Sequence, residues 1–183
     1  KKTIFAVSQN ESKRPILTGS LFEIESGVLS VVSTDNYRLA IIREVVDSSL
    51  TPTSFVVPGF TLREILKVLN DGDETVDIIV SDRYAMFDFG EFKVTTRLLE
   101  GKYINYRPVL QAPNNIYVYA HARDLADSLE RAALIINDDM TAKAEKLPVI
   151  LNVTSDKIEI TCMTSRGKVY DAIEVNASGE DLE

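Results

Sequence analysis

The residues best suited to recognition chemistry lie in one short stretch, residues 33–40 (STDNYRLA). Tyr37, Arg38 and Leu39 place an aromatic ring, a guanidinium and an aliphatic side chain next to one another. Because Tyr and Arg are enriched at the energetic hot spots of protein interfaces, this composition indicates a site where a peptide docks. These residues alone leave an alternative open, which is a polar turn followed by ordinary strand residues.

Residues that could support catalysis or bind a metal are sparse. His121 is the only histidine, so neither a His-rich metal site nor a triad with a choice of bases can be built. Because it precedes a predicted helix, we interpret it as a surface or capping residue. Cys162 is the only cysteine and lies in an alternating segment without a neighbouring histidine, which favours a buried structural thiol. We therefore expect no cofactor, and nothing in the sequence supports an enzyme.

The composition is that of a globular protein. The 183 residues are 45% hydrophobic and 26% charged, and they allow one large domain or two small ones. The net charge of −8 argues against binding nucleic acid with the whole surface, although a local basic face remains open. A single cysteine fits a reducing compartment, and no apolar run reaches the length of a membrane span. These features predict a soluble, cytoplasmic protein, and both ends suggest a fragment of a longer one.

The first part of the chain is predicted to form a helix end and then strands. Residues 1–8 are typical of the last turns of a helix, and residues 16–19, 21–25, 28–33, 37–44 and 55–57 are predicted strands. Thr34, Asp35 and Asn36 form the corner before the strand that begins near Tyr37. Their side chains can bond their own backbone, and Asn tolerates a left-handed conformation.

Two amphipathic helices are expected, over about 61–70 and 123–136. In the first, Thr61 and Glu64 match a capping box, and residues 70–72 (NDG) supply the stop. The spacing of its apolar residues predicts an inward face of Leu62, Ile65, Leu66 and Leu69. In the second helix, the predicted inward residues are Leu125, Leu129, Ala132 or Ala133, and Ile136. The predicted outward residues are Arg123, Asp127, Glu130 and Arg131.

Each helix precedes a set of antiparallel strands, which indicates an internal repeat. The predicted strands are 76–81, 84–89 and 91–99 after the first helix, and 149–154, 157–164 and 168–175 after the second, with a further strand at 116–120. Residues 137–146 are predicted to be a polar loop. Together with the helix end at residues 1–8 and the strands that follow it, these sets make three copies of a helix followed by a meander, which predict an α+β architecture built by duplication. The connector at 100–113 predicts two domains, 1–110 and 111–183.

Two surfaces could then serve function. The first is the outward side of the helices, where Arg63, Lys67, Arg123 and Arg131 could contact phosphates without reading bases. Its alternative is a charged face that only solvates the helices. The second combines the corner with residues 103–109, an apolar and aromatic segment that is expected to be exposed. Packing between the two domains is the alternative explanation for that segment.

The same segments resemble those of a known family. Residues 34–40 (TDNYRLA) resemble the TDGxRLA segment of bacterial sliding clamps, the β subunits of DNA polymerase III. Further similar segments follow in the family's order: 14–19 (RPILTG), 57–59 (VPG) with 62–65 (LREI), 96–103 (TRLLEGKY) and 105–107 (NYR). The resemblance assigns residues 1–110 to the clamp's middle domain, with its first helix truncated, and 111–183 to the first half of the C-terminal domain.

This resemblance implies the DNA clamp fold, with repeated helix-plus-antiparallel-sheet units in a head-to-tail homodimeric ring. Duplex DNA would thread the ring non-specifically, and the ring would tether the catalytic subunit of DNA polymerase III while also binding the clamp loader and other proteins with a clamp-binding motif. The chain itself would be a non-catalytic processivity subunit. The competing interpretation is an adaptor domain that binds protein and does not associate with DNA.

The resemblance also maps the family's peptide pocket onto Leu17, Thr34, Asn36, Tyr37, Arg38, Leu39, Ile104, Pro108 and Val109. Its apolar members would bury a partner's terminal Leu and Phe, and Arg38 would frame the rim. Four positions differ from the common family pattern: Asn36 replaces Gly, Ile104 replaces Pro, Pro108 replaces Arg, and Phe60 stands where Lys is frequent.

Overall fold

The computed structural model describes residues 1–9, 14–69, 75–111, 115–139 and 147–179. The chain divides into two compact units, Lys1–Leu110 and Gln111–Glu183. Both combine helices with antiparallel sheets, so the predicted α+β architecture is confirmed. No helix in the described part of the chain is long and apolar enough to cross a membrane.

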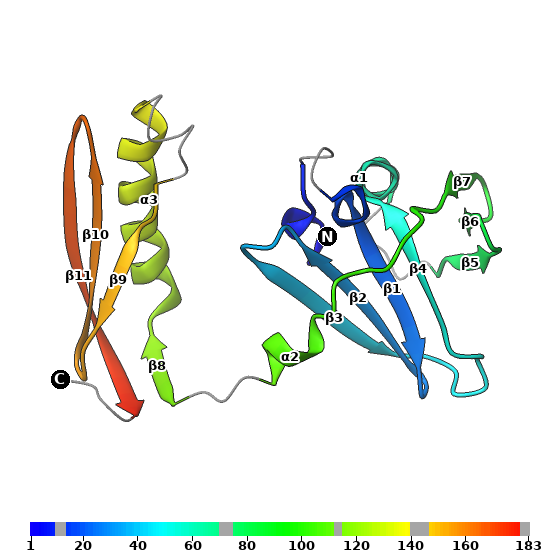
Figure 1. The fold of residues 1–183 in the computed structure, drawn as a ribbon, viewed down its shortest axis with the longest axis horizontal. Coiled ribbons are helices and arrows are strands. Elements are labelled where there is room, and N and C mark those ends of the chain that lie inside the picture. Colours follow the sequence, from blue (N-terminus) through cyan, green and yellow to red (C-terminus); the bar gives the residue numbers. More distant parts are fainter. Residues whose placement is uncertain (10–13, 70–74, 112–114, 140–146, 180–183) are drawn as a thin grey trace. The chain divides into compact units, whose positions relative to one another are not determined.

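The first unit is organised around a four-stranded antiparallel sheet (Figure 1). Its strands, in the spatial order β3-β2-β1-β4, are β1 (Gly19–Glu25), β2 (Val28–Thr34), β3 (Leu39–Val45) and β4 (Thr53–Pro58). Two short 3-10 helices precede it, η1 (Ile4–Ala6) and η2 (Pro15–Thr18). In the central pairing, Leu21 of β1 lies opposite Val32 on one side and Val56 on the other. Because successive side chains of a strand alternate, Leu21 and Phe22 project to opposite faces of the sheet.

One face of this sheet packs on the unit's main hydrophobic core. The sequence continues through α1 (Gly59–Val68), then β5 (Asp77–Val80), β6 (Tyr84–Asp88) and β7 (Lys93–Arg97), which form a second sheet in that order. Phe22 stacks on Phe55 with ring centres 5.3 Å apart and meets Phe87 edge-on at 6.5 Å. Ile65 of α1 joins this cluster, and Leu62 and Leu69 pack against it. The predicted inward face of the first helix is thus confirmed at these positions.

The opposite face of the sheet bears a second apolar cluster, covered by the connector that follows β7. Its buried members are Leu17, Leu21, Val32, Val56, Tyr103 and Tyr106. The connector ends in a single helical turn, α2 (Arg107–Leu110). Tyr103 and Tyr106 are buried within this unit, so the expectation that both are exposed is wrong. Burial of their large rings stabilises the connector in place across the sheet.

The described residues of the second unit likewise combine a helix with a four-stranded antiparallel sheet (Figure 1). Its elements are β8 (Ile116–Ala120), α3 (Ala122–Asp138), β9 (Ile150–Val153), β10 (Lys157–Thr164) and β11 (Gly167–Gly179), and the sheet order is β8-β11-β10-β9. Ile158, Ile160 and Ile173 form its core, and Leu125 of α3 packs against them. Cys162 is a buried free thiol, as predicted.

The predicted strand at residues 16–19 is wrong for its first three residues, which form η2. Pro15 begins the turn with its fixed φ, and the Thr18 hydroxyl donates to the Pro15 carbonyl oxygen at 2.7 Å. The backbone carbonyl of Leu17 accepts a hydrogen bond from Ser8, which ties η2 to the preceding segment. The expected helix at residues 1–8 is likewise reduced to the three residues of η1.

The predicted capping box of the first helix is also wrong. α1 begins at Gly59, directly after Pro58, and not at Thr61. The Thr61 hydroxyl is instead 2.8 Å from that of Thr96, and Glu64 pairs with Lys67 at 2.7 Å. A Cβ on Gly59 would lie 2.7 Å from the Thr18 carbonyl oxygen, so this close approach selects glycine there. The predicted stop at 70–72 lies outside the described residues, as do residues 140–146 of the predicted polar loop.

The second helix differs from its predicted face at two places. Leu129 is 36% exposed, whereas Ser128 and Ala132 are fully buried. Leu125 packs against the core and Ala132 is buried, as predicted, so the difference is confined to Leu129 and Ser128. Ser128 can be buried because its hydroxyl donates to Asp171 Oδ2 on β11 at 2.7 Å.

Candidate functional site

The corner between β2 and β3 is held by its own side chains. The Thr34 hydroxyl donates to the Arg38 carbonyl oxygen at 2.7 Å and accepts from the Asn36 backbone N–H at 3.2 Å. Asp35 Oδ1 accepts from the backbone N–H groups of Tyr37 and Arg38, each at 3.1 Å. Asn36 adopts φ 74°, a left-handed conformation that Asn tolerates. The predicted corner is therefore confirmed, and it fixes the directions of Tyr37 and Arg38.

The ion pair between Asp35 and Arg38 orients the rim of the site, which Tyr37 and Arg38 form. Arg38 Nε lies 3.2 Å from Asp35 Oδ2. Partial burial opposes ionisation of Asp35, but backbone hydrogen bonds from Arg38 and Tyr37 and the Arg38 charge together lower the pKa of its carboxyl. On its other side, the Arg38 guanidinium lies over the Phe5 ring, 5.5 Å from the ring centre. Tyr37 itself is 84% exposed. The rim thus presents an aromatic ring and a restrained cation to solvent.

Below this rim lies the apolar cluster on the connector side of the sheet. Leu17 is almost fully buried at 1% exposure, and Leu39 and Ile104 are partly buried against the same cluster. The structure therefore brings together Leu17, Leu39 and Ile104, which are far apart in the sequence. Partly exposed aliphatic side chains on a buried base can accept an apolar side chain from a partner.

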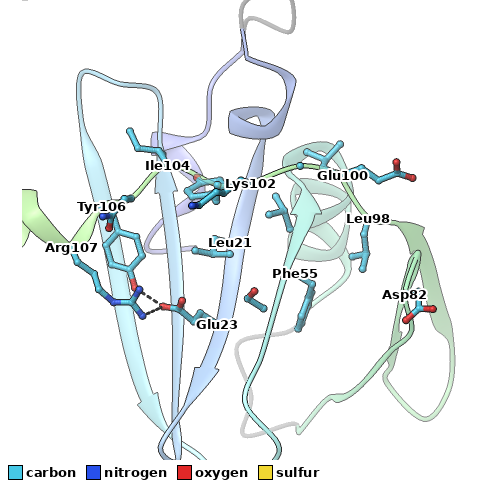
Figure 2. Close-up of a pocket in the computed structure, with 16 residues that line it drawn as sticks. Leu21, Glu23, Phe55, Asp82, Leu98, Glu100, Lys102, Ile104, Tyr106 and Arg107 are labelled. Carbon is cyan, nitrogen blue, oxygen red and sulfur yellow. Dashed lines mark hydrogen bonds and ion pairs between the residues drawn. The ribbon is translucent and has the colours of Figure 1, made fainter.

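Polar contacts anchor the connector that carries the remaining predicted residues (Figure 2). Tyr106 OH donates to Glu23 Oε2 at 2.8 Å, and Arg107 Nη2 donates to Glu23 at 2.9 Å and to Glu25 at 3.0 Å. Burial and the neighbouring Glu23 carboxylate raise the pKa of the Tyr106 hydroxyl. These bonds hold the start of α2, where the next two residues, Pro108 and Val109, are both exposed.

A hollow of about 620 Å³ runs beside this anchor, between the connector and strands β1 and β4 (Figure 2). Ile104 is the only one of the predicted pocket residues that lines this hollow. Neither the hollow nor the role of Glu23 is predicted from the sequence. The sequence does indicate that Glu23 lies on the same face as Leu21, because it follows Leu21 at the two-residue spacing of a strand.

The buried hydroxyl of Tyr103 makes the stability of the first unit depend on pH in the alkaline range. Its hydroxyl donates to the carbonyl oxygens of Gly19 at 3.3 Å and Val32 at 3.5 Å. Burial raises the pKa of Tyr103 to about 12, against a smaller opposing effect of a backbone hydrogen bond with Thr34. A folded-state pKa above the unfolded value means that this stabilisation is complete below about pH 10 and is lost as the pH rises toward 12.

We therefore expect the unfolding free energy of the first unit to fall by about 2 to 3 kcal/mol between pH 10 and pH 12 because of Tyr103. Tyr103→Phe should flatten this part of the profile, whereas Tyr84→Phe, which removes the hydroxyl of a half-exposed residue, should leave it unchanged. Urea denaturation at a series of alkaline pH values measures both. An equally steep fall in Tyr103→Phe would assign the loss of stability at alkaline pH to another group.

The four helix cations predicted to face DNA differ in their surroundings. Arg63 and Arg123 are exposed on α1 and α3. Lys67 pairs with Glu64, and Arg131 pairs with Asp171 of β11 through both Nε and Nη2. The hydrogen bonds from Arg131 and Ser128 lower the pKa of Asp171. Arg131 therefore lies at the edge of α3 beside the sheet, and not on the outward side where it was expected.

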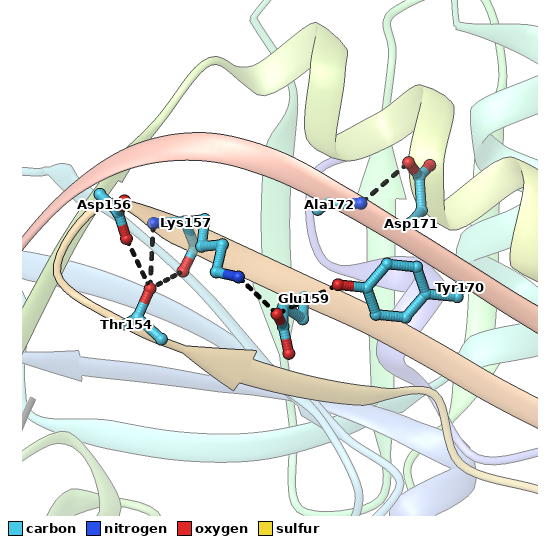
Figure 3. Close-up of polar contacts among 7 residues, drawn as sticks. All are labelled: Thr154, Asp156, Lys157, Glu159, Tyr170, Asp171 and Ala172. Carbon is cyan, nitrogen blue, oxygen red and sulfur yellow. Dashed lines mark hydrogen bonds and ion pairs between the residues drawn. The ribbon is translucent and has the colours of Figure 1, made fainter. Parts of the chain in front are cut away.

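Other polar contacts of the second unit hold its hairpins (Figure 3). Glu159 Oε1 accepts from Lys157 Nζ at 2.6 Å and from the Tyr170 hydroxyl at 3.1 Å, and these bonds lower the pKa of Glu159. At the turn before β10, Thr154 contacts Asp156. His121 precedes α3 without a side-chain capping bond and is a surface residue. The bond between Tyr170 and Glu159 joins β11 to β10, whereas the contacts of Lys157 and Thr154 stay within β10 and the turn before it.

The fold defines a protein of repeated helix-plus-antiparallel-sheet units, the first of which bears a partly exposed apolar cluster below the corner between β2 and β3. The family model of the DNA polymerase III beta subunit, central domain, matches residues 1–105. The chain therefore belongs to the DNA polymerase III beta subunit family.

Known relatives align with the whole length of this chain. It is 32% identical to the beta sliding clamp of Halalkalibacterium halodurans and 28% identical to that of Bacillus subtilis, each over 100% of this chain and 48% of the relative. A crystal structure of a putative DNA polymerase III beta subunit from Eubacterium rectale superposes with a TM-score of 0.86 at 31% identity, covering 98% of this chain and 47% of that one. The chain thus spans about half the length of these relatives.

Proposed function

We propose that the protein containing this chain is a DNA sliding clamp, the processivity factor of a bacterial replicative polymerase. In this proposal residues 1–110 are its middle domain and residues 111–183 are the first half of its C-terminal domain. The protein is a cytoplasmic, non-catalytic ring that encircles duplex DNA and tethers the polymerase. Membership of the beta subunit family and the repeated units support it.

The observation that carries the proposal is the apolar cluster below the corner. Leu17, Leu39 and Ile104 converge there from η2, β3 and the connector. In the proposed pocket they accept the terminal Leu and Phe of a partner peptide, while Tyr37 and Arg38 form its rim. The corner residues Thr34 and Asn36 fix the rim, and the exposed Pro108 and Val109 supply an outer wall. Partners are the polymerase catalytic subunit, the clamp loader and other proteins with the same peptide.

The DNA contact in this proposal is weak and non-specific. Arg63 and Arg123 are its main members because they lie exposed on the two long helices. Lys67 and Arg131 contribute less, since each is already paired with a carboxylate. A net charge of −8 fits a ring that slides, because a sliding protein requires weak phosphate contacts and geometric retention.

We expect the intact protein, once loaded, to be retained on nicked circular DNA and to be lost when the circle is linearised. Arg63→Ala combined with Arg123→Ala should shorten retention and lower the slope of log affinity against log salt by about one for each lost phosphate contact. The measurement is gel filtration of protein–DNA complexes over a range of salt concentrations.

Arg83→Ala combined with Arg166→Ala is the matched control, because it removes the same charge from two turns outside the helices. It should leave the salt slope unchanged. Equal retention on circular and linear DNA would contradict topological tethering. No association with either DNA would favour an adaptor that binds protein alone.

A further inference from the structure

Phe5 lies beside the corner, although nothing in its sequence position indicates this. It is the middle residue of η1 and is 58% exposed. η1 packs against β2 and β3, the two strands that the corner joins. The Phe5 ring consequently lies under the Arg38 guanidinium, whose central carbon is 5.5 Å from the ring centre. This distance is that of a cation–π contact.

Arg38 is therefore restrained from two directions. Asp35 Oδ2 accepts from Nε at 3.2 Å, and the Phe5 ring covers one side of the guanidinium. The Arg38 side chain is nevertheless 56% exposed. A guanidinium has five N–H donors. When Nε of Arg38 is bonded to Asp35, the outer donors on Nη1 and Nη2 can still bond a partner. Holding such a side chain in one orientation before binding reduces the entropy lost on binding.

We propose that Phe5 is a positioning residue of the peptide site. Its ring orients Arg38 so that the outer guanidinium donors meet a carbonyl or carboxylate oxygen of the bound peptide at the edge of the apolar cluster. The inference rests on the proposed function and adds η1 to a site otherwise formed by residues 17, 34–39 and 104–109. Phe5 acts through Arg38 and requires no contact of its own with the peptide.

The test is a double-mutant cycle in the intact protein with a fluorescent peptide ending in Gln-Leu-Ala-Leu-Phe. Phe5→Leu keeps an apolar side chain but removes the ring face, and it should weaken binding by about two- to five-fold, as expected for an exposed cation–π contact. Phe5→Tyr keeps the ring face and should bind like the parent. In an Arg38→Gln background, Phe5→Leu should have no further effect.

A second readout follows Arg38 directly. In the free protein, Phe5→Leu should shift the NMR signal of Arg38 Nε–H and speed its exchange with water, whereas Phe5→Tyr should preserve both. Equal affinities of the parent and Phe5→Leu, or an equal loss in the Arg38→Gln background, would overturn the positioning role while leaving the peptide site intact. If the parent itself does not bind the peptide, the proposed function fails, and this inference fails with it.

Discussion

Leu39→Asp should weaken binding of a peptide ending in Gln-Leu-Ala-Leu-Phe by about 30-fold or more, the effect of losing an interface hot spot. Leu39 is partly buried against the cluster that contains Leu17 and Ile104. An aspartate there would place a carboxylate where the peptide's apolar side chains must pack, and desolvation of that charge opposes the complex. Because Leu39 is partly exposed in the free chain, the carboxylate can reach water when no peptide is bound. Fluorescence anisotropy of the labelled peptide measures the loss.

Val45→Asp is the matched control for this prediction. It makes a similar exchange at the other end of the same strand, where Val45 is 89% exposed. Its peptide affinity should equal that of the parent. Parent-like binding by Leu39→Asp, or an equal loss in both variants, would place the peptide elsewhere on the protein. Thermal unfolding of the two variants separates lost recognition from lost folding.

The sequence predicts the strands and helices of this fold well, because both periodicities are strong. Leu62, Ile65 and Leu69 recur at helical spacing, and the strands predicted at 21–25 and 28–33 lie within β1 and β2. Local chemistry also predicts the corner, since Thr34, Asp35 and Asn36 bond mainly within their own turn. These predictions depend on neighbours in the sequence, and the structure confirms them.

Two of the wrong predictions, the helix cap and the exposed connector, depend on contacts between distant segments. Thirty-five residues separate Thr61 from Thr96, whose hydroxyl it meets, and this contact replaces the predicted helix cap. Likewise, Tyr103 and Tyr106 are buried because Gly19, Val32 and Glu23 offer them hydrogen-bond acceptors across the sheet. The contact of Phe5 with Arg38 has the same character. No periodic pattern encodes such pairs, so the sequence alone could not identify them.

Phe22→Ala should reduce the unfolding free energy of the first unit by about 3 to 5 kcal/mol. Phe22 is buried between Phe55 and Phe87, with ring centres 5.3 Å and 6.5 Å away, so truncation removes the middle ring and leaves a cavity. Such a loss is a large fraction of the 5 to 15 kcal/mol that typically stabilises a domain. Urea denaturation followed by the NMR amide signals of β1 reports on this unit alone.

Phe92→Ala separates the effect of burial from that of aromatic stacking. Phe92 stacks on Phe89 at 4.6 Å but is 39% exposed, so its loss should cost only about 1 kcal/mol. Phe22 also faces away from the cluster of Leu21, so Phe22→Ala should bind the peptide with nearly parental affinity under conditions where it stays folded. A loss of affinity as large as that of Leu39→Asp would mean that the two faces of β1 are coupled. Parental affinity together with a large loss of stability would show that one face of the strand carries the fold and the other carries recognition.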